Sequence, residues 1–324
     1  MTGHEIIRRA IEFECPPRIG IMFDEMGVND TYIVTYGFGK EFQPATPDED
    51  EWGYTHEKTG MPNMGQVKVH PIQTIDDLRN RAFPNPDDDA RYEIIESILP
   101  YADGRYVIGY IGFGIFEQLH FLHGFTESLA DLYLNPALIE TLLDVILNFK
   151  VRLIENFHKR FPGMIHGVTM TDDWGTQQAT FVSVPMWRTF FRPRYKRLFD
   201  TAHAAGMHFW LHSCGRINAL MPEFIDLGLD VINLQQPRAL GIEDIGRKFR
   251  GKICFESLVD IQTTLPGGSK EEINNEASLL LQHWATPEGG FILSDYTDSE
   301  AIQVSYKQKK RMFEAFKRAG KFDV

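Results

Sequence analysis

The tetrapeptide His212-Ser213-Cys214-Gly215 joins two residue types that bind soft metal ions. It follows an apolar run at residues 207–211, which is typical of a buried strand. Residues two apart on an extended chain point the same way, so the imidazole and the thiol should lie side by side where this strand ends. A mixed nitrogen and sulfur pair suits zinc. For this pair taken alone, the alternative is a buried cysteine beside a hydrogen-bonded core histidine.

Polar residues also follow the other predicted strands, at the same relative position. They are Asp24 and Glu25, Asp172 and Asp173, residues 233–236, Glu256 and Ser257, and residues 294–296. Each of them alone could cap a helix, because Asp, Asn and Ser are preferred at helix N-termini. A thiol, an imidazole and several carboxylates gathered at one end of a sheet favour a metal site instead.

Zinc needs three or four ligands, so His212 and Cys214 must be joined by others. Glu256 lies near the C-terminal end of its predicted strand. Asp295 directly follows the last predicted strand, and Asp298 is the alternative ligand from the same loop. We therefore expect Glu256 and Asp295 to complete the metal site.

Asp172 and Asp173 are adjacent, so at most one of their carboxylates points into a cavity at the end of the strand. Such a carboxylate can act as a general acid or base, orient a substrate or hold a metal-bound imidazole. We predict a catalytic role for this pair.

Aromatic side chains near the same strand ends could stack against a flat substrate. Phe113, Trp174 and Tyr296 are the predicted contacts, and core packing is the alternative for each of them. Asp24, which follows the first predicted strand, is expected to contact the substrate as well.

The composition is that of an ordinary globular protein, with 324 residues, of which 43% are apolar and 24% charged. The formal net charge of −12 and the lack of a basic stripe disfavour nucleic acid as a partner. Three cysteines, Cys15, Cys214 and Cys254, are too few for a disulfide framework and favour a reducing compartment. Cys254 is expected to pack in the core. With no signal peptide and no long apolar run, we expect a cytoplasmic protein that does not span a membrane.

Short apolar runs alternate with amphipathic segments through most of the chain. Strands are predicted at residues 18–23, 106–113, 167–170, 207–211, 231–234, 253–255 and 291–293. Helices are predicted at residues 4–13, 74–82, 90–101, 117–134, 136–161, 185–205, 217–227, 242–248, 270–284 and 299–318. Residues 40–72 are polar and rich in Gly and Pro, which predicts a long excursion with a few short strands. The alternation predicts an α/β fold, a single (β/α)8 TIM barrel over residues 1–324, with an N-terminal helix and this early excursion.

The order of these motifs resembles the uroporphyrinogen decarboxylase-like superfamily, whose members are (β/α)8 barrels. The resemblance covers nearly the whole chain. It rests on His212-Ser213-Cys214-Gly215, residues 172–177 and 259–266, Asp50-Glu51-Trp52-Gly53 with His70-Pro71, and Phe116-Glu117 with residues 122–125.

Two activities are known in this superfamily. True decarboxylases carry an Arg-Gln-Ala-Gly-Arg segment that meets an acidic tetrapyrrole, whereas residues 18–30 hold one arginine among acidic residues. The other branch contains cobamide-dependent methyltransferases, whose zinc-binding His-x-Cys matches His212 and Cys214. Coenzyme M methyltransferases of that branch have a further cysteine in the loop after the last strand, and residues 294–298 have none.

The resemblance therefore implies a zinc-dependent methyltransferase, the methyltransferase component of an O-demethylase. With fewer thiolates and more carboxylates, the zinc is a stronger Lewis acid toward oxygen. We expect transfer of a methyl group from an O-methyl donor, such as a methoxylated aromatic, to the cob(I)alamin of a corrinoid protein. The alternatives are a metal-free decarboxylase of a smaller acid, with Asp24 or Asp173 as its acidic centre, a corrinoid:thiol methyltransferase, and a non-catalytic corrinoid-binding barrel.

Overall fold

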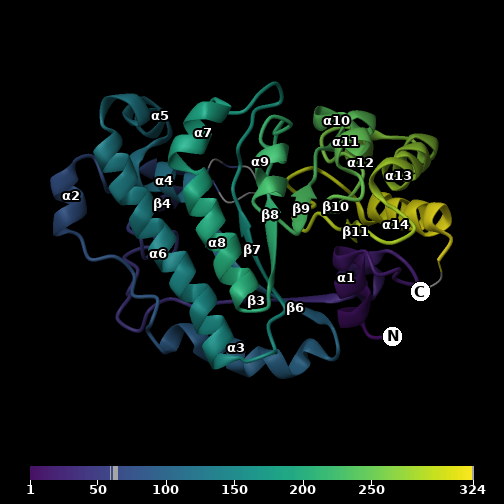
Figure 1. The fold of residues 1–324 in the computed structure, drawn as a ribbon, viewed down its shortest axis with the longest axis horizontal. Coiled ribbons are helices and arrows are strands. Elements are labelled where there is room, and N and C mark those ends of the chain that lie inside the picture. The colour runs from purple at the N-terminus through teal and green to yellow at the C-terminus, as the bar shows by residue number, and fades with distance from the viewer. Residues whose placement is uncertain (59, 61–64, 323–324) are drawn as a thin grey trace.

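The structure is a computed structural model, and it describes residues 1–58, 60 and 65–322 (Figure 1). Nine strands form one sheet in the order β2-β1-β11-β10-β9-β8-β7-β6-β3. These strands are β1 (Gly20–Phe23), β2 (Val28–Asn29), β3 (Thr31–Thr35), β6 (Tyr106–Phe113), β7 (Gly167–Thr171), β8 (His208–His212), β9 (Val231–Leu234), β10 (Cys254–Ser257) and β11 (Phe291–Ser294). The short strand β2 pairs antiparallel with β1, and the other neighbouring pairs are parallel.

Asp30, directly before β3, joins the β3 end of this sheet to β1, the neighbour of the short terminal strand β2. Its carboxylate accepts a hydrogen bond from the backbone N–H of Ile21 at 2.9 Å, and its carbonyl accepts one from Tyr106 N–H at 2.8 Å. Arg18 holds the same buried carboxylate at 2.6 Å. The sheet is therefore nearly closed, which confirms the predicted TIM-barrel-type fold.

Helices cover the outside of the sheet. They are α1 (Gly3–Glu12), α2 (Ile75–Asn80), α3 (Ala90–Ile98), α4 (Ile115–His123), α5 (Phe125–Leu134), α6 (Pro136–Arg160), α7 (Val184–Phe190), α8 (Arg192–Ala204), α9 (Met221–Asp226), α10 (Pro237–Leu240), α11 (Ile242–Phe249), α12 (Thr264–Gly267), α13 (Lys270–Trp284) and α14 (Tyr306–Gly320), with 3-10 turns η1 (Asp24–Met26) and η2 (Leu99–Ala102). Figure 1 shows α6 and α8 on one side of the strands and α13 and α14 on the other.

Some elements differ from the prediction. The expected helix at residues 117–134 is divided into α4 and α5, because Gly124 takes a left-handed conformation with φ of 97°. The expected helix at residues 185–205 is likewise divided, between α7 and α8. The last helix begins only at Tyr306, where the Ser305 side chain caps it. Strand β3 was not predicted.

The excursion at residues 40–72 contains two short antiparallel strands, β4 (Thr55–Glu57) and β5 (Gln66–Val69), as expected. Residues 59 and 61–64 of it lie outside the described residues. The excursion is tied down by Glu51, which forms a bidentate pair with the fully buried Arg91 at the start of α3. The neighbouring Trp52 packs against the ring of Phe149 in α6, with centroids 5.1 Å apart.

The barrel interior is apolar at the amino ends of the strands. Ile108, Trp210, Val231, Cys254 and Ile292 form a buried cluster there, into which α1 inserts its own apolar face. The helix thereby closes this end of the barrel. Cys254 belongs to the cluster and is fully buried, so the prediction that it packs in the core is confirmed.

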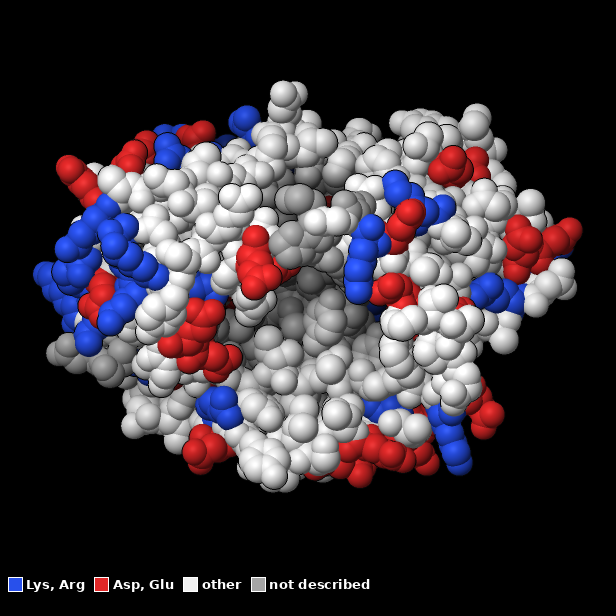
Figure 2. Space-filling view, turned by 180° about the vertical axis from the view of Figure 1, so that it is seen from behind, with Lys and Arg blue, Asp and Glu red and all other residues white. Residues whose placement is uncertain are grey.

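Two general features bear on partners. Within the described residues, no helix combines the length and apolar character that crossing a bilayer requires. On the face drawn in Figure 2, one group of Lys and Arg side chains lies at the left edge, and Asp and Glu side chains lie around the central hollow.

Candidate metal centre

The barrel interior becomes polar toward the carboxyl ends of the strands. On five of the strands, the residue two positions after the member of the apolar cluster is polar. These residues are Tyr110, His212, Asn233, Glu256 and Ser294. His212 pairs in register with Asn233, and Asn233 with Glu256. Because side chains alternate faces along a strand, these residues point the same way as the apolar cluster below them. The polar layer therefore lies at the end of the barrel where such folds carry their active sites.

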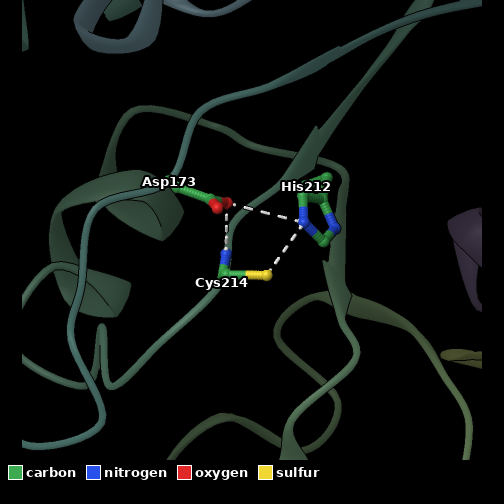
Figure 3. Close-up of side chains that lie close together, drawn as sticks. All are labelled: Asp173, His212 and Cys214. Atoms are coloured by element: carbon green, nitrogen blue, oxygen red, sulfur yellow. Dashed lines mark hydrogen bonds and ion pairs between the residues drawn. The ribbon is translucent and has the colours of Figure 1, made fainter. Parts of the chain in front are cut away.

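Asp173, His212 and Cys214 come together at this end, and within the described residues they form one group able to hold a metal ion. One ligand atom from each lies within 4.8 Å of the other two. His212 Nε2 is 3.3 Å from Cys214 Sγ and 3.5 Å from Asp173 Oδ1. Figure 3 shows the three side chains facing one another, with Asp173 on the loop after β7 and the other two at the end of β8.

His212 is oriented by Asn233. The side-chain oxygen of Asn233 lies within hydrogen-bond distance of His212 Nδ1. Because an amide oxygen only accepts, Nδ1 carries the proton in the neutral imidazole and Nε2 turns its lone pair toward Cys214 and Asp173. This arrangement, in which the outer ring nitrogen is held by an oxygen, is typical of metal-binding histidines.

The loops after β7 and β8 are bound to each other, which brings Asp173 to the pair. Asp173 Oδ1 accepts the backbone N–H of Cys214 at 2.7 Å, and Ser213 Oγ accepts that of Trp174 at 3.1 Å. Gly215 takes a φ of 81°, and a Cβ there would lie 2.1 Å from the carbonyl oxygen of Gly175. Both glycines are thus needed for the close approach of the two loops.

Acidic surroundings control the protonation of the site. Burial, together with the carboxylates of Asp173 and Glu117, raises the pKa of the Cys214 thiol. Burial, together with Asp173 and Asp172, raises the pKa of Glu117 well above its usual value. Glu117 Oε2 also accepts a hydrogen bond from Thr171 Oγ1 at 2.8 Å. Without a metal, the thiol therefore holds its proton at neutral pH, and the Glu117 carboxyl is more readily protonated than an exposed glutamate.

The structure does not bring the other two expected ligands into the group. Glu256 is buried, and the side chains of Ser294 and Asn233 lie beside its carboxyl. Asp295 turns away instead, because its Oδ2 lies 2.8 Å from the buried Nζ of Lys309. Asp173 therefore occupies the position beside His212 and Cys214 that the sequence assigned to these carboxylates.

The two adjacent aspartates have separate environments, as the alternation of side chains predicted. Asp172 is fully buried and accepts backbone hydrogen bonds from Phe116 and Glu117 at the start of α4, at 3.1 and 2.9 Å. It also accepts one from the Tyr195 hydroxyl. Burial raises the pKa of Asp172 to about 6. Its contacts hold α4 in place, whereas Asp173 faces His212 and Cys214.

Two of the aromatic residues expected to contact a substrate, Trp174 and Tyr296, have different surroundings. Trp174 is fully buried and stacks on Phe116 with centroids 4.7 Å apart, so its ring packs in the core and is not presented to a substrate. Tyr296 is half-buried, and its pKa is raised by burial and by carboxylates and the thiol nearby, among them Asp173 and Cys214. The Tyr296 side chain therefore lies near the metal group.

Phe113 and Asp24 lie at neighbouring strand ends. The half-buried ring of Phe113, at the end of β6, lines a cavity and packs edge-on against Phe121 with centroids 4.9 Å apart. Asp24 is exposed in η1, directly after β1, and its substrate contact stays a prediction.

Two residues of the centre had no assigned role in the sequence. The sequence indicates Asn233 only as a polar residue at the end of a strand. Its contact with His212 follows from the register of the two strands, which places the two residues side by side. Glu117 was noted only within the Phe116-Glu117 motif, since a glutamate in the first turn of a helix is common. Its position directly after a glycine-ended strand is the signal that could have identified it.

A barrel of parallel strands with an imidazole, a thiol and a carboxylate converging at the carboxyl ends defines a TIM-barrel protein with a candidate metal centre. The chain belongs to the uroporphyrinogen decarboxylase (URO-D) family, whose sequence profile matches residues 56–299. This confirms the resemblance derived from the motifs.

One solved structure supports the fold. A methyltransferase from Methanosarcina mazei is 17% identical, with 79% of this chain and 74% of that chain covered and a TM-score of 0.60. A D-psicose 3-epimerase is 13% identical over 69% of this chain and 80% of its own, with a TM-score of only 0.38. A sequence comparison with curated proteins found no significant match.

Proposed function

We propose that the protein is a zinc-dependent methyltransferase that moves a methyl group from a methoxylated aromatic donor to the cob(I)alamin of a corrinoid protein. The observation that carries this proposal is the convergence of Asp173, His212 and Cys214 within 4.8 Å. The family and the similar fold of a methyltransferase support it. Within this family, a metal-binding His-x-Cys resembles the methyltransferase branch rather than the decarboxylases.

The donor set fits zinc. Imidazole nitrogen, thiolate sulfur and carboxylate oxygen are its usual protein ligands, and three of them leave a fourth position for a substrate, as in catalytic zinc sites. His212 already has the tautomer that a ligand needs, since Asn233 holds its Nδ1. When bound, zinc would act as a Lewis acid toward an ether oxygen of the donor.

Glu117 is the residue placed to supply a proton. In the proposed reaction the bond between the methyl carbon and the ether oxygen breaks, and its electron pair stays on the oxygen. The methyl carbon is bonded to cobalt through the electron pair of the cob(I)alamin. The phenolate left behind takes a proton, and we assign Glu117 as the donor, because burial raises the pKa of its carboxyl. Thr171 fixes the orientation of that carboxyl.

Methyl transfer with and without the metal tests the proposal. Zinc-loaded protein, free cob(I)alamin and a panel of methoxylated aromatics should give a methylated cobalamin and the demethylated phenol. Chelation should abolish transfer, and added zinc should restore it. Release of carbon dioxide from a small acid, insensitive to chelation and without any methyl transfer, would contradict the proposal.

A further inference from the structure

A cavity of about 250 Å³ lies at the carboxyl ends of β3 and β6. Its walls come from the segment after β3, the turn of the excursion at residues 50–54, the end of β6 and the first turn of α4. Its volume exceeds the about 150 Å³ in which benzene binds and falls below the about 300 Å³ at which drug-sized sites begin. The cavity therefore suits one substituted ring.

The walls offer flat apolar surface and hydroxyl groups. Phe113 and Trp52 contribute rings, while Tyr36, Tyr54 and Tyr110 contribute rings that carry a phenolic hydroxyl. Aromatic walls of this kind stack well against an aromatic ligand, and hydroxyls exchange hydrogen bonds with its polar substituents.

Gln118 leaves a donor unused in this cavity. The residue is 4% exposed, and its side-chain oxygen accepts a hydrogen bond from the Tyr54 hydroxyl at 3.5 Å. Its Nε2 is buried and has no partner. A buried N–H₂ group without an acceptor is costly, and an acceptor oxygen on a ligand would remove that cost.

The charge of the cavity is negative. Asp50 and Glu51 lie on its wall, and no lysine, arginine or histidine is among the described residues that line it. Glu51 is paired with Arg91, and the buried Nζ of Lys150 lies behind the wall on the carbonyl of Phe113. Among the described residues, Asp50 is therefore the wall carboxylate without an ion pair of its own. An anionic ligand would be repelled here, because a like charge in a half-buried site is unfavourable.

Tyr110 connects the cavity to the metal centre. Its side chain lies beside Thr171 at the end of β7, and Thr171 donates a hydrogen bond to Glu117 at 2.8 Å. Glu117 influences both Asp173 and Cys214 electrostatically. A ring in the cavity would thus lie one layer of side chains from the candidate metal ligands.

From these contacts we infer that the cavity binds the ring of a neutral methoxyphenol, with an oxygen of the ligand accepting from Gln118, and that it rejects the anionic methoxybenzoates. This inference rests on the proposed function for the fate of the methyl group. Binding of the ring does not depend on that function.

Direct binding tests the inference without methyl transfer. Calorimetric titration of the zinc-loaded protein with 2-methoxyphenol and 3-methoxybenzoate should be done at about pH 8, where a phenol is neutral and a benzoate is charged. We expect the phenol to bind at least about 10-fold more tightly. Gln118→Leu, which keeps the volume and removes the donor, should weaken phenol binding about 10-fold. Gln282→Leu, on the exposed face of α13, is the matched control and should not change it.

A second variant keeps the test decisive if Gln118→Leu unfolds. Asp50→Asn retains an oxygen for the backbone N–H of Trp52, which Asp50 now accepts at 2.9 Å, and removes the charge. It should reduce the preference for the phenol over the benzoate. Equal binding of both ligands by the wild type, or a preference unchanged in Asp50→Asn, would overturn the inference. Selective phenol binding without methyl transfer would support the cavity and contradict the proposed function.

Discussion

Asp173 Oδ1 lies 3.5 Å from His212 Nε2, although the two residues follow different strands of the barrel. The same oxygen accepts the backbone N–H of Cys214 at 2.7 Å. One carboxylate therefore aligns the loop that carries the thiol and faces the imidazole. This relationship extends a two-residue motif to a three-residue candidate metal centre, and the predictions on metal binding follow from it.

Metal content should depend on this centre. Protein prepared without chelators and supplied with zinc should hold about one zinc per chain, and Cys214→Ala should lose it. Elemental analysis after gel filtration measures the ratio. Cys15→Ala is the control, because Cys15 is exposed and lies outside the three-residue group. Equal zinc in the Cys214 and Cys15 variants would exclude the assignment.

Asn233 should act on zinc through His212. Asn233→Leu removes the oxygen that fixes the imidazole, so zinc affinity should fall about 10–100-fold. Asn233→Asp keeps an acceptor at the same place and should retain most of the affinity. Competition with a colorimetric chelator compares the three proteins. A Leu variant that binds zinc as tightly as the wild type would show that the contact does not orient a ligand.

Glu117 should affect the reaction and not the metal. Glu117→Gln cannot release a proton, so kcat for methyl transfer should fall about 10²–10⁴-fold while zinc content stays unchanged. Donors whose phenolate is a better leaving group need less proton transfer and should lose less activity. Glu243→Gln, on the exposed face of α11, serves as the control. A uniform loss across donors would argue for a structural role of Glu117 instead.

The pH dependence of stability should reflect the pair of His203 and Asp230, whose Nε2 and Oδ2 are 2.8 Å apart. The hydrogen bond to Asp230 raises the pKa of His203. The pair therefore stabilises the fold fully below the unfolded pKa of about 6.5, and this stabilisation is lost as pH rises through the folded value. Both side chains are partly exposed, so its size should be under about 1 kcal/mol.

Urea unfolding of the wild type and His203→Gln tests this sign. The difference between their free energies of unfolding should be larger at about pH 5.5 than at about pH 8.5. Other titrating groups are common to both proteins and cancel in the difference. A gap that grows with pH would mean that burial, not the ion pair, dominates at His203.

Much of the barrel could be predicted from the sequence, because apolar runs of a few residues mark β6 to β11 directly. Strand β3 was missed, since Thr31–Thr35 follows β1 without the helix that usually separates parallel strands. The break at Gly124 was missed as well, because one glycine within an amphipathic pattern does not reveal its φ.

The site could be predicted only for residues that lie close together in the sequence. The period of two along a strand places His212 beside Cys214, and it separates Asp172 from Asp173. The third member of the group depends on how two loops pack, and that contact requires Gly175 to meet Gly215. Asp295 was assigned as a ligand because nothing in the sequence indicates that Lys309, in the last helix, reaches its carboxylate.

The fate of an isotopically labelled methyl group tests the central claim most directly. Zinc-loaded protein would be mixed without oxygen with cob(I)alamin and 2-methoxyphenol that carries the label on its methoxy carbon. We predict that the label appears on cobalt in an amount equal to the catechol formed, and that Cys214→Ala forms neither product. Intact 2-methoxyphenol and unmethylated cobalamin after incubation with protein of full zinc content would contradict the account.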